Sequence, residues 1–261
     1  MLAPRFAELK ASGRRALVCY VTAGHPDRER SIALVQGIAD AGADIIELGV
    51  PFSDPVADGP VIQASSQRAL DGGMTLDGTL EIASAARVEQ PLVLFTYLNP
   101  LLSAGADVLQ RAHAAGIAGL LTTDLPVGED SERERWIGEG PLDFVRLVAP
   151  TTPTERMAKI ASHGRGFVYL ISRLGVTGAR ADVPTDLPGT VTRLRSVCPL
   201  PICVGFGVST GAQARAVAAL ADGVVVGSAL VSAAERSVDE AVEFVRSLRR
   251  ALDETPQATA S

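Results

Sequence analysis

The sequence predicts an α/β protein, a single-domain (β/α)₈ TIM barrel, from three observations. The chain has 261 residues and is 47% hydrophobic, which suits one large core of the α/β barrel size class. Short apolar runs alternate with amphipathic segments along its length, as parallel strands alternate with helical crossovers. Eight strand-like runs in a chain of this length favour a closed barrel over an open sheet.

The expected strands are short apolar runs at 17–22, 44–48, 92–97, 119–123, 144–148, 167–172, 202–205 and 224–227. Between them, helical periodicity is found at 28–41, 104–115, 154–162, 190–197, 211–219 and 239–252. An additional N-terminal helix at 2–12 is expected to plug the barrel floor. The polar tail at 253–261 is expected to fray.

Two intervals between successive strand starts, 44 to 92 and 167 to 202, are the longest, so long loops are expected after strands two and six. The loops that follow strands form the catalytic face of a barrel. The loop after strand six contains a glycine-rich run at 173–180, and we expect this loop to act as a lid.

The charge balance and the cysteines favour a cytoplasmic enzyme. A net charge of −6 and a pI near 5.2 give no basic surface for nucleic acid or anionic membranes. The cysteines Cys19, Cys198 and Cys203 are odd in number and lack metal-ligand spacing, which fits a reducing compartment. No apolar run is long enough to span a bilayer.

The segment 45–60 contains the residues most suited to acid–base chemistry. Strand periodicity puts Ile45 and Glu47 on one face, so an apolar strand presents a single carboxylate. Prolines at 51, 55 and 60 stiffen the following loop, which carries Asp58. A shielded acid and a loop acid in different surroundings suit paired acid–base catalysis. Taken singly, the strand acid is also consistent with an arginine partner, and Asp-Gly with a simple turn.

Glycine-rich loops follow the last three predicted strands, at Gly175 and Gly178, at 205–207 and at Gly227-Ser228. Barrels commonly bind phosphate with their last loops, where glycine lets the anion approach backbone N–H groups. One Gly-x-Gly is usually a tight turn, but three at consecutive strand ends favour a phosphate site.

The remaining residues narrow the reaction class. The only lysines, Lys10 and Lys159, lie in predicted helices, where neither can form a Schiff base at a strand end. The histidines His25, His113 and His163 are scattered, so no metal site is expected. With Schiff-base and metal-assisted reactions excluded, the reaction class that remains is proton transfer by carboxylates, without a cofactor.

The segment 46–59, IELGVPFSDPVADG, and the following VIQASSQRAL closely resemble the signature of the tryptophan synthase alpha subunit family. The resemblance implies retro-aldol cleavage of indole-3-glycerol phosphate to indole and glyceraldehyde 3-phosphate. Glu47, with its pKa raised by apolar walls, would deliver a proton to indole C3 and accept the hydroxyl proton. Asp58 would stay ionised and accept a hydrogen bond from the indole N–H.

The same resemblance implies roles for further residues. Tyr169 matches an active-site tyrosine of the family, although a core tyrosine fits the sequence equally well. Thr177, in the expected lid, would bond Asp58 on closure. The indole slot would be lined by Tyr20, Leu98, Leu121 and Phe206, and the phosphate held by Gly178, Gly207, Gly227 and Ser228. Tyr20 departs from a phenylalanine found in one branch of the family.

The resemblance also implies a partner. The family forms an αββα complex in which indole passes to a pyridoxal-phosphate site in the beta subunit. Asp54 and Pro55 would lie at the contact, and docking would act through the loop 51–60 and the lid 175–188. Two alternatives remain open at this stage, a stand-alone indole-3-glycerol-phosphate lyase and a non-catalytic phosphate-binding barrel.

Overall fold

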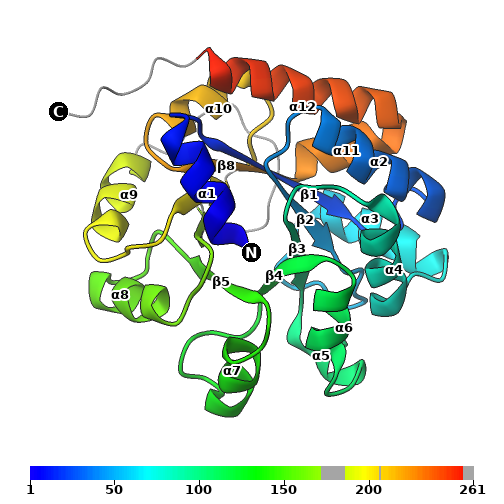
Figure 1. The fold of residues 1–261 in the computed structure, drawn as a ribbon, viewed down its shortest axis with the longest axis horizontal. Helices are drawn as coiled ribbons and strands as arrows, with labels where there is room; N and C mark the ends of the chain where they lie inside the picture. The colour runs from blue at the N-terminus through cyan, green and yellow to red at the C-terminus, as the bar shows by residue number, and fades with distance from the viewer. Residues whose placement is uncertain (172–185, 206, 255–261) are drawn as a thin grey trace.

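The computed structural model describes residues 1–171, 186–205 and 207–254, in which eight parallel strands form a closed barrel. The strands follow one another around the barrel in chain order, and β8 pairs with β1 to close it (Figure 1). The predicted fold class is therefore confirmed. The strands are β1 Ala16–Thr22, β2 Ile45–Gly49, β3 Leu92–Thr96, β4 Ile117–Thr122, β5 Asp143–Val148, β6 Val168–Ile171, β7 Ile202–Gly205 and β8 Gly223–Val226.

The eight predicted strands coincide with these apart from small shifts at their ends, and helices surround them. The helices are α1 Leu2–Ala11, α2 Arg28–Asp40, α3 Pro60–Asp71, α4 Leu76–Ala86, α5 Leu98–Ser103, α6 Val108–Ala114, α7 Ser131–Gly138, α8 Thr154–Ser162, α9 Leu187–Arg195, α10 Gly211–Ala218, α11 Ser228–Arg236 and α12 Val238–Asp253.

The sequence patterns predicted some of these helices incorrectly. The helix expected at 104–115 begins only at Val108, as α6, because Gly105 adopts a left-handed φ of +96°. A separate helix that the sequence did not predict, α5, precedes this glycine. The α12 helix extends through Asp253, which was expected to belong to the frayed tail. Residues 255–261 lie outside the described part of the chain.

The long interval after β2 is a loop at 50–59 followed by two helices that the sequence did not predict, α3 and α4. The α3 helix buries Ser65 and Ser66 together with Ile62 and Ala69, so half of its buried residues are polar. The Ser65 hydroxyl lies 2.7 Å from the hydroxyl of Thr22 on β1, so this face docks partly through a hydrogen bond. Helical periodicity in hydrophobicity alone does not reveal such a face.

The α1 helix closes one end of the barrel, as predicted, and lies across the barrel in Figure 1. Its Leu2, Phe6 and Leu9 are buried in the inner core, and the ring of Phe6 lies 5.6 Å from that of Phe167. The N–H of Leu2 donates to a carboxylate oxygen of Asp143 at 2.8 Å. The floor of the barrel is therefore filled, which leaves the opposite end for binding.

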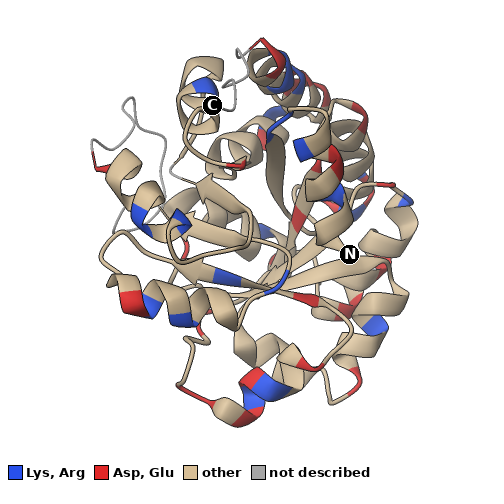
Figure 2. Cartoon of the chain, turned by 60° about the vertical axis from the view of Figure 1, so that its left-hand side comes forward, with Lys and Arg blue, Asp and Glu red and all other residues tan. Residues whose placement is uncertain are grey.

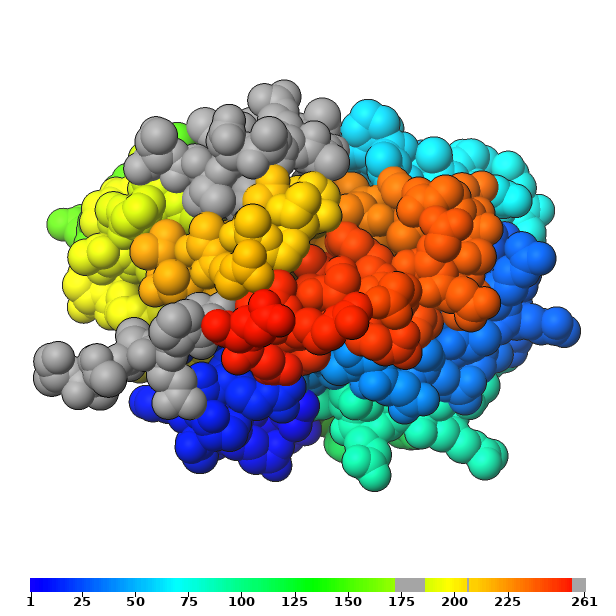
Figure 3. Space-filling model, turned by 90° about the horizontal axis from the view of Figure 1, so that it is seen from above, coloured from blue at the N-terminus to red at the C-terminus, as the bar shows by residue number. Residues whose placement is uncertain are grey.

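Asp44, immediately before β2, links α1 and α12 to the barrel. Its carboxylate is buried and accepts hydrogen bonds from Arg5 of α1 at 2.6 Å, Arg249 of α12 at 2.9 Å and the N–H of Leu17 at 2.8 Å. Figure 3 shows α12, in red, packed against α10 and α11. Elsewhere the charged residues lie mainly on the surrounding helices and loops (Figure 2). Within the described ranges, no helix is both long and apolar enough to cross a membrane.

Candidate active site

Glu47 is a lone carboxyl inside the barrel. It lies in register between Tyr20 of β1 and Val93 of β3, and its side chain is almost completely buried. Neither carboxyl oxygen has a hydrogen-bond partner among the described residues. Burial raises the pKa of Glu47 from 4.5 to about 8, because an apolar site disfavours the charged form. The carboxyl is therefore protonated and available for transfer near neutral pH.

The alternation predicted for β2 accounts for this position. Ile45, two residues before Glu47, belongs to the inner core, whereas Ile46 and Leu48 belong to the outer core beneath the helices. The period of two residues thus aims the single acid of the strand into the barrel.

Asp58 lies in the 50–59 loop, which local hydrogen bonds hold rigid. Its N–H donates to the carbonyl of Pro55 at 3.0 Å, and its carbonyl accepts from the side chain of Gln63 at 2.9 Å. Burial raises the pKa of the Asp58 carboxyl to about 6, and a hydrogen bond from Tyr97 acts in the opposite direction. The two acids of the site therefore differ in pKa, with Asp58 the more readily ionised.

Tyr97 is a candidate site residue that the sequence analysis did not name. Its phenol donates to Oδ2 of Asp58 at 3.1 Å and accepts from the N–H of Ala57 at 3.0 Å. Its ring packs against that of Phe52, with centroids 5.0 Å apart. Tyr97 directly follows β3. Its place as a polar aromatic residue at a strand end is the only feature of the sequence that could have indicated a place in the site.

Aromatic side chains form the walls around Glu47. Tyr20 packs edge-on against Phe95 with centroids 5.2 Å apart, and Tyr169 packs on the inner core. Burial and the charge of Glu47 raise the pKa of the Tyr169 phenol, which places Tyr169 near this acid. Small residues make room for the phenols. A Cβ at Gly49 would clash with the Tyr20 oxygen, and one at Gly205 would clash with the Tyr169 oxygen.

The structure separates two residues that the sequence analysis placed together in the indole slot. Leu121 is buried in the inner core, as expected for a residue facing the barrel interior. Leu98, by contrast, begins α5 and packs against the outer core, while Phe95 of β3 contacts the inner core and Tyr20. Phe95 therefore occupies the type of position that had been assigned to Leu98.

The two helices that follow β7 and β8 differ at their N-termini. The α10 helix is closed by a capping box in which Thr210 caps the N–H of Gln213, whose side chain bonds the Thr210 N–H. The α11 helix starts at the buried Ser228, after Gly227, and has no side-chain cap. The first N–H groups of a helix lack partners within it, and their positive end favours anions.

Of the predicted phosphate contacts, Gly227 and Ser228 thus lie at an uncapped helix N-terminus. Gly207 follows β7 in a left-handed conformation with φ of +85°. Gly178, Thr177 and Phe206 lie outside the residues that the structure describes.

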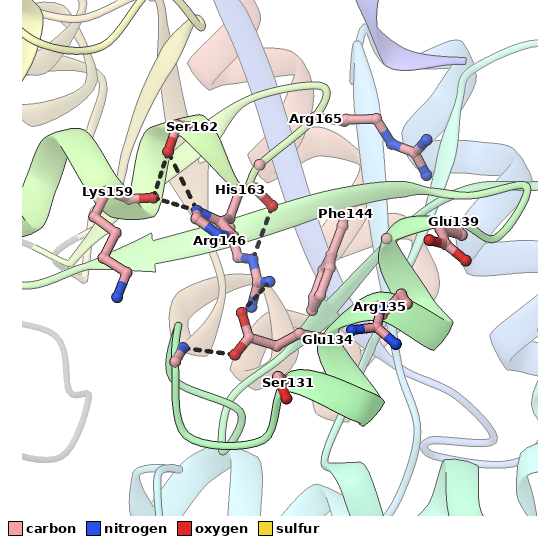
Figure 4. Close-up of a pocket in the computed structure, with 13 residues that line it drawn as sticks. Ser131, Glu134, Arg135, Glu139, Phe144, Arg146, Lys159, Ser162, His163 and Arg165 are labelled. Atoms are coloured by element: carbon pink, nitrogen blue, oxygen red, sulfur yellow. Dashed lines mark hydrogen bonds and ion pairs between the residues drawn. The ribbon is translucent and has the colours of Figure 1, made fainter.

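A separate cavity of about 470 Å³ lies in the helix layer, between α7, α8 and the outer face of β5 (Figure 4). Its wall contains a buried ion pair of Arg146 and Glu134, 3.1 Å apart, and the Arg146 guanidinium lies 3.6 Å above the Phe144 ring. Arg146 also donates to the carbonyls of Leu125 and His163. The ion pair thus joins α7 to β5. The cavity shares no lining residue with the site around Glu47.

The described residues hold no group of three or more His, Cys, Asp or Glu side chains arranged as metal ligands. Lys10 is in α1 at the plugged end of the barrel, and Lys159 is in α8. Neither lysine is near Glu47, as the sequence analysis expected.

Comparison with known proteins points to one family. The family model for the tryptophan synthase alpha chain matches residues 6–260. The alpha chain of Desulfatibacillum aliphaticivorans is 48% identical over 242 residues, covering 91% of this chain and 89% of that protein. The alpha chain of Geobacter sulfurreducens is 46% identical over 259 residues, covering 96% of this chain and 98% of that protein.

Solved structures agree with this result. A Mycobacterium tuberculosis tryptophan synthase structure superposes with a TM-score of 0.90 at 39% identity, covering 96% of this chain and 97% of that chain. The alpha subunit from Legionella pneumophila gives a TM-score of 0.88 at 34% identity, with coverage of 97% and 98%. The chain therefore belongs to the tryptophan synthase alpha chain family.

Proposed function

We propose that Glu47 and Asp58 together catalyse the retro-aldol cleavage of indole-3-glycerol phosphate in this chain. Members of the family are lyases acting on that substrate, and the chain belongs to the family. One observation carries the assignment of roles. The buried Glu47 carboxyl lacks a protein partner among the described residues and has its pKa raised to about 8, so it holds a transferable proton at neutral pH.

The proposed reaction needs two proton movements on one face of the substrate. Glu47 gives its proton to indole C3, which makes that carbon tetrahedral and leaves positive charge on the ring nitrogen. The Glu47 carboxylate then takes the proton of the side-chain hydroxyl. The bond from C3 to the side chain breaks, its electron pair restores the aromatic indole, and the former hydroxyl carbon becomes the aldehyde of glyceraldehyde 3-phosphate. One residue thus acts first as acid and then as base.

Asp58 stabilises the charged intermediate in this scheme. Its ionised carboxylate accepts a hydrogen bond from the indole N–H, where positive charge develops. Its lower pKa, about 6, leaves it charged while Glu47 is still protonated. Tyr20, Phe95, Leu121 and Tyr169 supply the walls against which the indole ring packs, and Tyr169 also offers a phenol close to Glu47.

The phosphate group is proposed to bind at the N-terminus of α11. The uncapped N–H groups that begin at Ser228 can donate to the anion, and Gly207 and Gly227 permit close approach. Gly178 and Thr177, in the segment outside the described residues, complete the proposed set as a phosphate contact and a contact to Asp58.

The proposed partner is a tryptophan synthase beta subunit carrying pyridoxal phosphate, in an αββα complex, while this chain itself uses no cofactor. The apolar Val56 is 72% exposed at the tip of the 50–59 loop, next to Asp54 and Pro55. An exposed apolar residue on an otherwise rigid loop suits a protein contact. Because Asp58 shares this loop, docking can alter the position of its carboxylate.

The direct test is indole release from indole-3-glycerol phosphate, with and without a matched beta subunit. We expect slow release by the chain alone and faster release in the complex. Absence of indole under both conditions would reject the lyase assignment. Equal rates under both conditions would instead support a stand-alone lyase.

The pH dependence of kcat/KM is expected to be bell-shaped, because the two acids must be in opposite protonation states. Below a pH of about 6, Asp58 becomes protonated and loses the charge that stabilises the ring. Above a pH of about 8, Glu47 loses the proton that it must deliver. Since kcat/KM reports the free enzyme, steady-state assays between pH 5 and 9 should show limbs near about 6 and 8. A profile that is flat between pH 5 and 9 would contradict this division of roles.

A further inference from the structure

The hydrogen bonding of Tyr97 determines the surroundings of Asp58. A phenol has one proton to donate and two lone pairs to accept hydrogen bonds. The Tyr97 proton goes to Oδ2 of Asp58 at 3.1 Å, and one lone pair accepts from the N–H of Ala57 at 3.0 Å. One acceptor position on the phenol therefore remains.

Thr123 is a neighbour of Tyr97 at the end of the adjoining strand, because Thr96 of β3 pairs in register with Thr122 of β4. It directly follows β4, and its N–H donates to the carbonyl of Thr96 at 3.1 Å, so the backbone anchors it next to the residue preceding Tyr97. The oxygen of its hydroxyl is buried and has no hydrogen-bond partner in the geometry of the described residues. Burial and the charge of Asp58 raise the pKa of the Tyr97 phenol, and the nearby Thr123 hydroxyl lowers it. The hydroxyl is thus close enough to affect the phenol.

We propose that Thr123 is a positioning residue that donates its hydroxyl proton to Tyr97 and thereby fixes the phenol as a donor to Asp58. With both lone pairs occupied, the phenol proton has only the carboxylate as its partner. A phenol that accepts a second hydrogen bond is also a stronger donor, because hydrogen bonds in a chain polarise one another. The stronger bond favours the ionised form of Asp58. This inference rests on the proposed catalytic role of Asp58.

The other groups around Asp58 cannot take the place of the hydrogen bonds that run from Thr123 through Tyr97 to its carboxylate. Tyr20 of β1 and Tyr169 of β6 sense the charge of Asp58, and Glu47 of β2 is the second carboxyl of the site. No ion pair to Asp58 is formed within the described part of the protein, so no cation there offsets its burial. The phenol of Tyr97 is the side chain whose hydrogen bond lowers the pKa of Asp58.

The test compares Thr123→Val, which removes only the hydroxyl, with Thr123→Ser, which keeps it. In kcat/KM profiles of the whole chain, Thr123→Val should move the acid limb upward by about 0.2–0.6 pH unit, as expected when one neighbour ceases to strengthen a charge-assisted hydrogen bond. Activity at pH 5 should then fall by roughly 1.5- to 4-fold, with the loss shrinking as pH rises. Thr123→Ser should restore the wild-type limb, and Tyr97→Phe should give a larger shift of about 1–2 units.

Thr122→Val is the matched control. Thr122 also has a buried hydroxyl without a partner among the described residues, but as the neighbouring strand residue it points to the opposite face. The acid limb of the Thr122→Val pH profile should coincide with that of the wild-type protein. Thr123→Ala serves as a second variant if valine impairs folding, which circular dichroism would reveal.

An unshifted acid limb in both Thr123→Val and Thr123→Ala would overturn the proposal. A shift in Thr123→Ser equal to that in Thr123→Val would also overturn it, because packing rather than the hydroxyl would then be the cause. Failure of the proposed function has a different signature, since the wild-type chain would then release no indole at any pH.

Discussion

Replacing Glu47 by glutamine is expected to lower indole formation by about 10²–10⁴-fold or more, the usual contribution of a positioned acid and base. Glutamine has the same shape but cannot deliver or accept the proton. The same substitution should make the folded chain more stable at pH 8, because a buried carboxyl is costly to ionise. Loss of activity together with a gain in stability would distinguish a catalytic acid from a structural one.

The sign of the stability effect follows from the raised pKa of Glu47. Between pH 4.5, the ordinary pKa, and about 8, the unfolded chain releases this proton while the folded chain retains it. The group therefore costs no stability at low pH, and its cost grows as pH rises through this window. Each unit of difference is worth about 1.4 kcal/mol, so the cost reaches a few kcal/mol at pH 8.

Thermal or denaturant unfolding at pH 5 and pH 8 measures this effect. The stability difference between Glu47→Gln and wild type should be small at pH 5 and largest at pH 8. Glu89→Gln, at an exposed position, is the control and should change neither activity nor stability. Wild-type turnover in Glu47→Gln would remove Glu47 from the mechanism, and a stability difference that does not depend on pH would contradict the raised pKa.

Replacing Asp58 by asparagine is expected to lower turnover by a similar factor, about 10²–10⁴-fold. Asparagine is neutral and cannot offset the positive charge that develops on the indole ring. The fold should be retained, because the amide oxygen can still accept the Tyr97 proton and the backbone bonds of Asp58 to Pro55 and Gln63 do not involve its side chain.

Steady-state kinetics separates this role from simple binding. We expect kcat to fall in Asp58→Asn with a small change in KM, because the lost interaction forms mainly in the transition state. The acid limb near pH 6 should also disappear from the pH profile. Unchanged kcat with a raised KM would instead make Asp58 a binding residue.

Local sequence patterns determined much of the architecture. The period of two residues in β2 placed Glu47 inside the barrel, since a strand buried on both faces still alternates its side chains. The prolines of the 50–59 loop indicated a rigid segment around Asp58, and the structure shows one held by local hydrogen bonds. These features depend on neighbours in the chain, and the sequence displays such neighbours directly.

Other features depended on contacts between residues distant in sequence, so only the tertiary structure decided them. The bond from Tyr97 to Asp58 joins residues 39 positions apart, and no local pattern specifies that pairing. The position of Phe95 rather than Leu98 against the inner core depends on α5, a helix that the sequence did not predict and that begins at Leu98. The burial of Ser65 in α3 likewise required Thr22 from β1. Hydrophobic periodicity predicts which face of an element is buried, but hydrogen-bond partners across the barrel are set only when the strands close around it.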